Sequence, residues 1–550
     1  MSKPEEKLQN PRRHHVLFLR HCVRSVKPTF SFNLESELGH HKTRFVKDYI
    51  ASPLPQWGVP NDWCSPGSLK FLRGTGEYLM KHVFLSDSEP KDKDGKRKIQ
   101  FQIISDTAHR DVDTSLAISQ GMSKIAAETP SSRLETDGLS RINLDFKLFN
   151  PYKEGKNDPP PMCKKTFSKG RKHKDIFDRF KKVSSPRDGL YSTLKRVQKL
   201  GGTKKKGPLT LMDYVSNVTL SSHAIPQGPI HILKVIGEMM LYSRAMGDID
   251  PVYLPDATLD DTYRILQWVF YLRSALGVDN VESASRGIVF ADAVLKALQS
   301  RHLESSNDKQ DFDTLVTIFV GHDSDMLALS TIFGLRWNLK APYHRGKTGD
   351  DNEYMMTPPG SCMHFIHDFE SKKVGLSYLY PVYLKESSNR KKKYQLNTKG
   401  DLKTVPMRLV NNTYDSKFSE DKSVMWFDSD DHANGMFGGM HVLNQELQAS
   451  LQKYPEVLDC YTKFANESTA AISYTPSSVE LPRETYDTEK AEHRLALRFF
   501  SLIGLVATFL VLLLLWSFKR KCCTSSSSYK KNIAYYKKVK TDEEVTDEKQ

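Results

Sequence analysis

Three short apolar runs, each followed at once by ionisable side chains, constrain the fold of this chain most. The runs are Val16–Leu19, Phe101–Ile104 and Leu315–Val320, and they lead into Arg20-His21, Ser105–Arg110 and His322-Asp323 respectively. Apolar runs without polar alternation are typical of central strands that are covered on both faces. In an open α/β sheet, ligands bind beyond the carboxyl ends of the strands, so we expect these ionisable residues to meet at one edge.

The stretch between the second and third runs is rich in helical patterns. Apolar residues recur at near-helical spacing from Tyr263 to Leu272 and from Ile288 to Leu298, and Gly228–Arg244 is a further helix candidate. The sequence therefore predicts a mainly helical insertion over residues 151–309 that caps the site. A basic and solvated loop occupies about residues 160–207 within it.

After residue 355 the pattern changes to strands. Cys362–Phe369 and Lys373–Tyr380 are two strand-like segments joined by a short polar turn, which predicts a hairpin. The predicted fold class is α/β: an open mixed or parallel sheet with helices on both faces. We assign this core to residues 14–150 and 310–480, on either side of the insertion.

The segment Phe499–Phe518 contains 20 residues without a charge, which is the length that a helix needs to cross a bilayer. Basic residues cluster directly after it, from Lys519 to Lys540, and this bias predicts that the tail, residues 519–550, lies in the cytoplasm. The large domain would then be lumenal or extracellular, in a lysosome-like compartment or at the cell surface. Candidate N-glycosylation sequons on that side begin at Asn217, Asn411 and Asn466.

This topology needs a leader, and the start of the sequence does not supply one. Its only apolar stretch, Val16–Leu19, is shorter than the 7–15 residues of a signal-peptide h-region. We expect the chain to begin downstream of a leader. The alternative is a tail-anchored protein with a cytosolic domain, for which 32 residues after the span, many of them charged, would have to cross the membrane.

The residues that follow the first strand have the chemistry of a phosphoryl site. Arg20, His21 and Arg24 place two guanidinium groups around one imidazole. Guanidinium forks bind phosphate oxygens in pairs and keep their charge at any pH. An imidazole between them can attack phosphorus and form a phosphohistidine, and His322-Asp323 adds a second imidazole and an acid for the departing alkoxide. Alone, the motif Arg20–Arg24 is more typical of a charged surface cluster, and Gly321–Asp323 is a weak signal, but their joint placement after buried strands indicates phosphoryl chemistry.

In these motifs the chain resembles the histidine acid phosphatases, the phytase-like branch of the histidine phosphatase superfamily. Four family signatures occur here in the expected order, over about residues 14–385. The motif R-H-G-x-R-x-P corresponds to Arg20–Val26, and the arginine that follows a strand and a Ser/Thr/Asp loop corresponds to Ser105–Arg110. The motif G-H-D-x-N corresponds to Gly321–Asp325, and P-P-G corresponds to Pro358–Gly360. The resemblance implies hydrolysis of a small-molecule phosphate monoester, with His21 as the nucleophile and Asp323 as the proton donor to the leaving group. It implies that the phosphoryl group is cradled by Arg20, Arg24, Arg110 and His322. No metal or other cofactor is implied, because the arginines supply the positive charge.

Three positions depart from the family pattern. Cys22 replaces the glycine after the nucleophile, Val26 replaces the proline, and Asp325 replaces the asparagine. The Cys22 side chain either crowds the phosphate or points into the core, and Asp325 adds negative charge near an anion site. These departures leave a second interpretation open, a catalytically weak phosphatase-like receptor or binding protein.

Other classes of function have less support. The net charge is +14, but the basic run Lys164–Lys182 comes without an RNP or zinc-finger pattern, so no nucleic-acid partner is predicted. The adjacent pairs His14-His15 and His40-His41 point to opposite faces of a strand and ligate poorly together, so no metal is predicted either. Seven cysteines in 550 residues exclude a scaffold built from disulfides.

Overall fold

The computed structural model of the chain describes residues 11–26, 29–32, 42–45, 55–149, 235–246, 266, 281–337, 357–386, 394–409, 425–428 and 439–453, with short gaps inside several of these ranges. The chain divides into two compact units, Met1–Thr475 and Pro476–Gln550, and all the described residues belong to the first.

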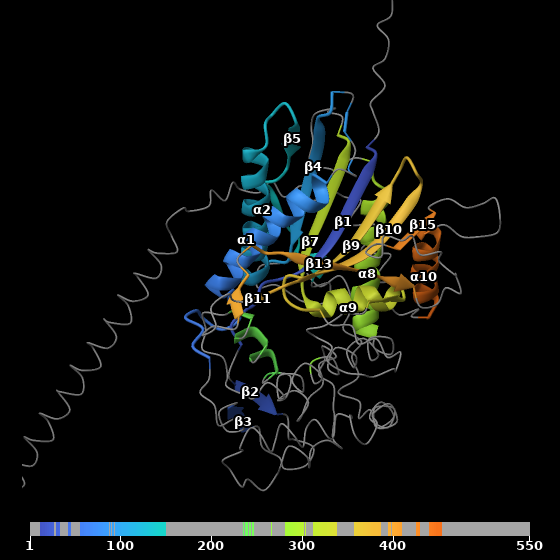
Figure 1. Cartoon of the computed structure of the whole chain (residues 1–550). Helices are drawn as coiled ribbons and strands as arrows, with labels where there is room; N and C mark the ends of the chain where they lie inside the picture. The colour runs from blue at the N-terminus through green and yellow to red at the C-terminus, as the bar shows by residue number, and fades with distance from the viewer. Residues whose placement is uncertain are drawn as a thin grey trace, which may run out of the picture. The chain divides into compact units, whose positions relative to one another are not determined.

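One mixed sheet forms the centre of this unit (Figure 1). Its strands, in spatial order, are β13 (Leu402–Pro406), β10 (Lys373–Pro381), β9 (Cys362–Asp368), β1 (Arg13–Arg20), β7 (Thr314–Gly321), β4 (Arg97–Ser105) and β5 (Leu134–Asp137), with β15 (Met425–Asp428) on β10 and β6 (Ile142–Leu144) on β4. Strands β1, β7 and β4 are parallel neighbours, whereas β9 and β10 join as an antiparallel hairpin. The predicted α/β class, its mixed sheet and the hairpin are confirmed.

Helices account for most of the other described residues. The longer ones are α1 (Pro66–Leu79), which continues into the π-helical turn η2 (Met80–Phe84), α2 (His109–Glu128), α8 (Val281–Gln299), α9 (Asp323–Ile332) and α10 (Gly439–Lys453). The remaining elements are the short helix α3 (Phe146–Phe149) and the strand pairs β2 (Thr29–Phe32) with β3 (Lys42–Phe45), β11 (Leu384–Glu386) with β12 (Tyr394–Leu396), and β8 (Leu335–Arg336) with β14 (Arg408–Leu409).

The sheet is covered on both faces, as the uninterrupted apolar run of β1 predicts. Successive side chains of a strand point to opposite faces. Phe18 packs edge-to-face on Phe290 of α8, with ring centroids 4.8 Å apart, whereas His15 packs on Phe84 of η2 at 5.5 Å. These two β1 residues have opposite parity, so α8 covers one face and the α1–η2 segment the other. Residues Val16–Leu19 are accordingly 0% exposed.

Helix α8 lies inside the range 151–309 that the sequence assigns to the insertion, yet it packs on the sheet and on α9. Gly287 of α8 lies so close to α9 that a Cβ there would be 2.6 Å from the carbonyl oxygen of Ala328. The residues described between 235 and 246 are mostly helical, in agreement with the helix predicted over Gly228–Arg244. The rest of the insertion, with its basic loop, lies outside the described residues.

The predicted membrane span 499–518, the tail 519–550 and the three sequons also lie outside the described residues. Within the part of the chain that the structure describes, no helix combines the length and the apolarity that crossing a membrane requires. Membrane attachment and topology therefore stay predictions.

Buried histidines lie in the half of β1 that is distant from its carboxyl end. His15 Nε2 lies 3.0 Å from Glu89 Oε2, and His15 Nδ1 lies 3.0 Å from His364 Nε2. A carboxylate only accepts hydrogen bonds, so His15 donates to Glu89. On the other face, His14 Nε2 contacts Thr317 Oγ1 at 3.0 Å. These hydrogen bonds hold the buried histidines of β1 in the core of the sheet.

We expect stability to fall on mild acidification because of His14. Burial lowers the pKa of His14 to about 3. The unfolded chain takes up this proton near pH 6.5 and the folded chain does not, so stability is complete above about pH 6.5 and is lost progressively below it. At about pH 5 the loss should be about 2 kcal/mol. Urea unfolding at both pH values should show a smaller difference for His14→Gln than for the wild type.

The matched control is His82→Gln, which changes an exposed histidine of η2. It should keep the wild-type pH dependence. An unchanged pH dependence in His14→Gln would contradict the assignment. The pKa of His364 is also held well below its ordinary value by burial and by His15, so part of the wild-type dependence should remain in His14→Gln.

Candidate active site

His21 is held directly beyond the carboxyl end of β1 by backbone hydrogen bonds. Its N–H donates to the carbonyl of Gly321 at the end of β7, at 2.9 Å. Its Nδ1 lies 2.9 Å from the carbonyl oxygen of Cys22, which can only accept, so Nδ1 carries the ring proton. The other nitrogen, Nε2, is therefore left with its lone pair. This tautomer is the one that a nucleophilic imidazole needs.

The surroundings of His21 keep the ring neutral. The residue is 3% exposed. Burial lowers its pKa well below the ordinary value, and the positive charges of Arg110, His322, Arg20 and Arg24 lower it further. A histidine with a low pKa keeps its lone pair even in acid, where a free imidazole would be protonated.

The turn that contains Gly360 leads into β9, the neighbour of β1, and its backbone contacts the segment that carries His21. The N–H of Gly360 lies 3.0 Å from the carbonyl oxygen of Arg20 and 3.2 Å from that of His21. Gly360 has a φ of +76°, a conformation that residues with a Cβ rarely adopt. The Pro358–Gly360 motif of the sequence is therefore part of the framework that fixes the main chain at His21.

The three arginines that the sequence singles out all lie at this edge, and each has an acidic partner. Arg20 Nη2 is 3.4 Å from Asp323, and Arg24 Nη1 is 2.7 Å from Asp62. Arg110 Nε is 3.8 Å from Asp111, and its Nη2 is 2.5 Å from His322 Nε2. The positive charge of the site is thus partly offset by carboxylates.

The cap insertion contributes two buried residues that the sequence analysis missed. Tyr242 Oη accepts a hydrogen bond of 2.6 Å from Arg20, and Glu238 lies 3.5 Å from Arg24. They are 1% and 3% exposed respectively. Both lie four residues apart in the helix predicted over 228–244, but nothing in their local sequence separates them from its core face. Only the fold brings this helix to the arginines.

His322 and Asp323 begin α9 immediately after β7. The imidazoles of His322 and His21 meet edge-on, with ring centroids 5.3 Å apart. Burial lowers the pKa of His322, but the carboxylates of Asp111 and Asp325 outweigh it and raise the pKa above the ordinary value. Asp323 is 8% exposed and faces Arg20. The structure thus brings His21, Asp323 and the four predicted phosphate-binding residues to one edge of the sheet.

The replacement of asparagine by Asp325 has a structural explanation. Its Oδ2 accepts from the backbone N–H of His322 at 3.0 Å and lies 3.2 Å from His322 Nδ1. This is a capping-box arrangement at the start of α9. Asp325 is 0% exposed, and its carboxylate holds the far side of the His322 ring. A Cβ at Gly321 would come within 2.5 Å of Phe149 and 3.1 Å of Asp325, so this approach requires glycine.

The other two departures point into the core. Cys22 forms a disulfide with Cys64, and the two residues are 0% and 1% exposed. The idea that the Cys22 side chain crowds the phosphate is therefore wrong, and the alternative of a buried side chain holds, with a bond that the sequence did not reveal. Val26 is also buried, at 2% exposed.

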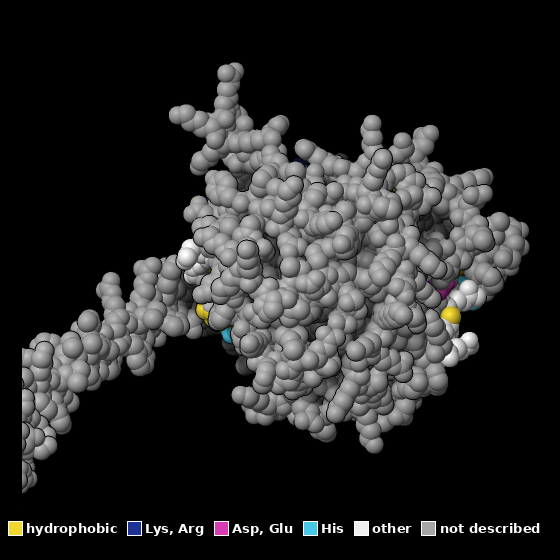
Figure 2. Space-filling model, turned by 90° about the horizontal axis from the view of Figure 1, so that it is seen from below, with side chains coloured by type: hydrophobic (Ala, Val, Ile, Leu, Met, Phe, Trp, Pro, Cys, Tyr) yellow, Lys and Arg dark blue, Asp and Glu magenta, His cyan; other side chains and the backbone are white. Residues whose placement is uncertain are grey.

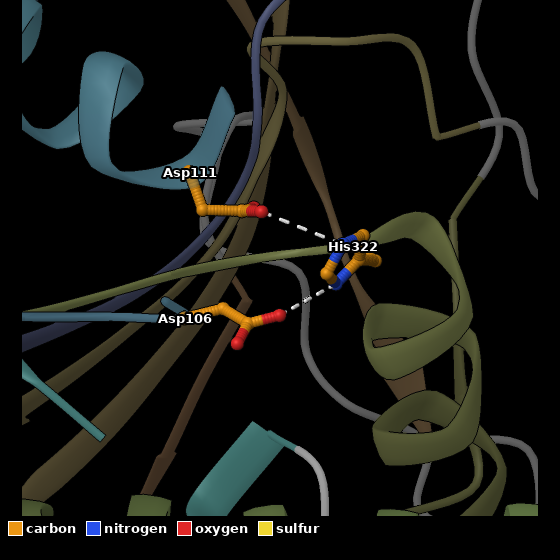
Figure 3. A group of neighbouring side chains, drawn as sticks. All are labelled: Asp106, Asp111 and His322. Atoms are coloured by element: carbon orange, nitrogen blue, oxygen red, sulfur yellow. Dashed lines mark ion pairs between the residues drawn. The ribbon is translucent and has the colours of Figure 1, made fainter. Parts of the chain in front are cut away.

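One group of described residues has a geometry that could accommodate a cation: Asp106, Asp111 and His322. Figure 3 shows the two carboxylates facing the imidazole from different sides, each toward its own ring nitrogen. The guanidinium of Arg110 already lies 2.5 Å from His322 Nε2, on the side of Asp111. The positive charge at this position therefore belongs to the protein, and we assign no metal ligands here.

Figure 2 views the molecule from below the sheet of Figure 1, and only small groups of described side chains reach the surface in this view. Arg20 and His21 are each 3% exposed.

Comparisons with known proteins find similarity in structure rather than in sequence. No model of a known protein family matches the sequence, and no curated protein matches it either. The structural neighbours are phytases. The Citrobacter braakii phytase has a TM-score of 0.48 at 15% identity, over 82% of this chain and 99% of the phytase. The apo Hafnia alvei phytase has a TM-score of 0.49 at 14% identity, over 82% and 98% of the two chains. The Klebsiella sp. ASR1 phytase has a TM-score of 0.40 at 14% identity, over 68% and 84%.

Proposed function

We propose that this chain hydrolyses phosphate monoesters through a phosphohistidine at His21, as an acid phosphatase of the histidine type. The observation that carries the proposal is the state of His21. Its Nδ1 proton is used by the carbonyl of Cys22, and its Nε2 lone pair is kept free by burial among three arginines. A neutral, fixed imidazole surrounded by guanidinium groups is suited to attack a phosphoryl group.

In the first step, Nε2 of His21 forms a bond to phosphorus while the ester P–O bond breaks. Arg20, Arg24 and Arg110 stabilise the negative charge on the phosphoryl oxygens. Arg110 leaves His322 Nε2 to bind the phosphate, and the raised pKa of His322 favours uptake of a second proton, so that this ring also donates to the phosphoryl group. When Arg20 turns from Asp323 to the phosphoryl group, Asp323 takes up a proton from solvent, and it gives this proton to the departing alkoxide.

In the second step, Asp323, now a carboxylate, takes a proton from the attacking water, the N–P bond breaks, and inorganic phosphate leaves with Asp323 restored as an acid. His21 regains its neutral form with Nδ1–H still directed to Cys22. The phosphoryl oxygens use the same arginines in both steps, so the site needs no further group for charge stabilisation. Sugar phosphates, inositol phosphates, lysophosphatidate and phosphoproteins all remain candidate substrates.

The carboxylates beside the arginines favour a second candidate function, a phosphatase-like binding protein with weak turnover. Asp323, Asp62 and Asp111 each lie within 4 Å of one of the three guanidiniums. Each such pair competes with phosphate for the arginine. Turnover of simple phosphate monoesters by the purified full-length chain decides between the two functions, because the binding protein would bind phosphate esters with little release of phosphate.

The location remains a proposal with one supporting observation. The Cys22–Cys64 disulfide is expected in an oxidising compartment rather than in the cytosol. It favours a lumenal or extracellular domain, anchored by residues 499–518, over the tail-anchored cytosolic alternative.

We expect Asp323→Asn to affect substrates according to their leaving groups. A general acid matters most when the leaving alkoxide is a strong base. Hydrolysis of an alkyl phosphate should therefore fall by about a hundredfold or more, and hydrolysis of p-nitrophenyl phosphate much less. Steady-state kcat on the two substrates measures the ratio. Equal losses on both would indicate that Asp323 only holds Arg20, which it faces at 3.4 Å.

A further inference from the structure

Asp111 is a buried carboxyl group beside the candidate anion site that the mechanism above does not use. It lies in the first turn of α2, directly after Arg110, and is 0% exposed. Neither of its carboxylate oxygens has a hydrogen-bond partner among the described residues. A buried carboxylate without hydrogen bonds is costly, so the group has a strong physical reason to change its protonation state.

The charges around Asp111 come from several elements and oppose one another. Its Oδ2 is 3.4 Å from His322 Nε2, between β7 and α9, and its own helix places Arg110 Nε at 3.8 Å. Asp106 follows β4, Asp325 lies in α9, and both are carboxyl groups close enough to affect it. Burial raises the pKa of Asp111 to about 7, because His322 and Arg110 only partly offset it while Asp106 and Asp325 add to it.

The same two cations would bind the phosphoryl group. When Arg110 and His322 turn to a phosphate dianion, they no longer compensate a negative charge on Asp111. The dianion itself then lies beside the carboxyl group. Both changes favour the neutral acid.

We propose that Asp111 is a proton-controlled positioning residue of the anion site, which is neutral whenever a dianion is bound. At any pH at which Asp111 is ionised in the empty site, the binding of a dianion is therefore accompanied by the uptake of one proton by Asp111. By linkage, the affinity for a dianion weakens as pH rises through the titration of Asp111. This device would confine phosphate binding to neutral and acid conditions. It rests on the proposed function, because it assumes that Arg110 and His322 bind the phosphoryl group.

The test is sulfate binding to the full-length chain by calorimetry, from about pH 5.5 to about pH 8.5. Sulfate stays a dianion over this range, so changes in affinity report the protein alone. Asp111→Asn removes the ionisation and keeps the shape. At about pH 5.5 the variant and the wild type should bind alike, and at about pH 8 the variant should bind about tenfold more tightly. Because the Asp111 carboxylate raises the pKa of His322, the titration of His322 is followed by NMR in both proteins and is taken into account before their affinities are compared.

Asp113→Asn is the matched control. It makes the same change on the same helix, at a carboxyl group that faces His109 instead of the anion site. It should follow the wild-type profile. If Asp111→Asn fails to fold by circular dichroism, Asp111→Ser serves as the second neutral variant. Proton uptake by the wild type, measured in buffers of different ionisation enthalpy, should exceed that of either neutral variant by about one proton at about pH 8.

A change in affinity that is the same at every pH would overturn the proposal, because it would give Asp111 only a structural role. Absence of sulfate binding to the wild type at every pH would overturn the anion site, and this proposal with it. Binding that is tight but independent of Asp111, together with phosphate ester turnover, would leave the proposed function in place and reject the role of Asp111.

Discussion

His21→Ala should abolish phosphate ester hydrolysis while the protein remains folded. In the proposed reaction only Nε2 of His21 bonds to phosphorus, so its loss removes the covalent route entirely. We expect kcat on p-nitrophenyl phosphate to fall by more than about a thousandfold. An activated aryl substrate is the stringent choice, because it needs no acid catalysis and reports the nucleophile alone.

The fold should tolerate this substitution. The His21 backbone N–H still donates to Gly321, and its carbonyl still accepts from Gly360. His82→Ala is the matched control, since it removes an exposed histidine of η2, and it should keep full activity. Rapid quench into alkali, in which the N–P bond of phosphohistidine survives, with a radioactive aryl phosphate should trap label on histidine in Asp323→Asn and none in His21→Ala. Substantial residual turnover in His21→Ala would contradict the nucleophile assignment.

The sheet was predictable because burial on both faces leaves a pattern that is visible along the chain. Val16–Leu19 and Leu315–Val320 have no polar alternation, and the structure makes them adjacent parallel strands. Parallel strands bring their carboxyl ends to one edge, so the placement of His21 near His322 follows from the strand assignment alone. The register confirms this, since Arg20 pairs with Gly321.

Contacts that depend on the tertiary path were not predictable in this way. Glu238 and Tyr242 reach the arginines from a helix about 220 residues downstream, where helical periodicity indicates only that a side chain is buried. The role that we propose for Asp111 was not predictable either, because it depends on burial in the folded chain. Its two carboxylate oxygens are buried without a hydrogen-bond partner among the described residues, which no sequence pattern reports.

The pairing of Cys22 with Cys64 was likewise hidden by sequence distance, since 42 positions separate the two residues and seven cysteines permit many pairings. Main-chain hydrogen bonds connect the same two segments as the disulfide. Arg24 and Cys64 form an isolated antiparallel bridge, the N–H of Ser25 donates to Trp63 at 2.9 Å, and the N–H of Ser65 donates to Val23 at 3.0 Å. The disulfide therefore fastens the segment that carries the nucleophile to the segment that leads into α1.

Replacing both cysteines, Cys22→Ser with Cys64→Ser, should destabilise the fold and weaken turnover together. Opening a loop of 42 residues restores entropy to the unfolded chain, which lowers the free energy of unfolding by about 4 kcal/mol. Turnover should fall as well, because His21 and Arg24 flank Cys22 and would lose their covalent support. A reductant should lower the melting temperature of the wild type and leave that of the double variant unchanged.

The same bond distinguishes the two topologies. Thiols in the intact producing cells are blocked by alkylation before lysis, and the peptides that contain residues 22 and 64 are then analysed without reduction. A disulfide-linked peptide is expected, because a lumenal or extracellular domain folds where thiols are oxidised. Alkylated thiols at both positions would instead favour the tail-anchored alternative with its domain in the reducing cytosol. In that case the wild type and the double variant should have similar stability inside the cell, since the loop between residues 22 and 64 would be open in both.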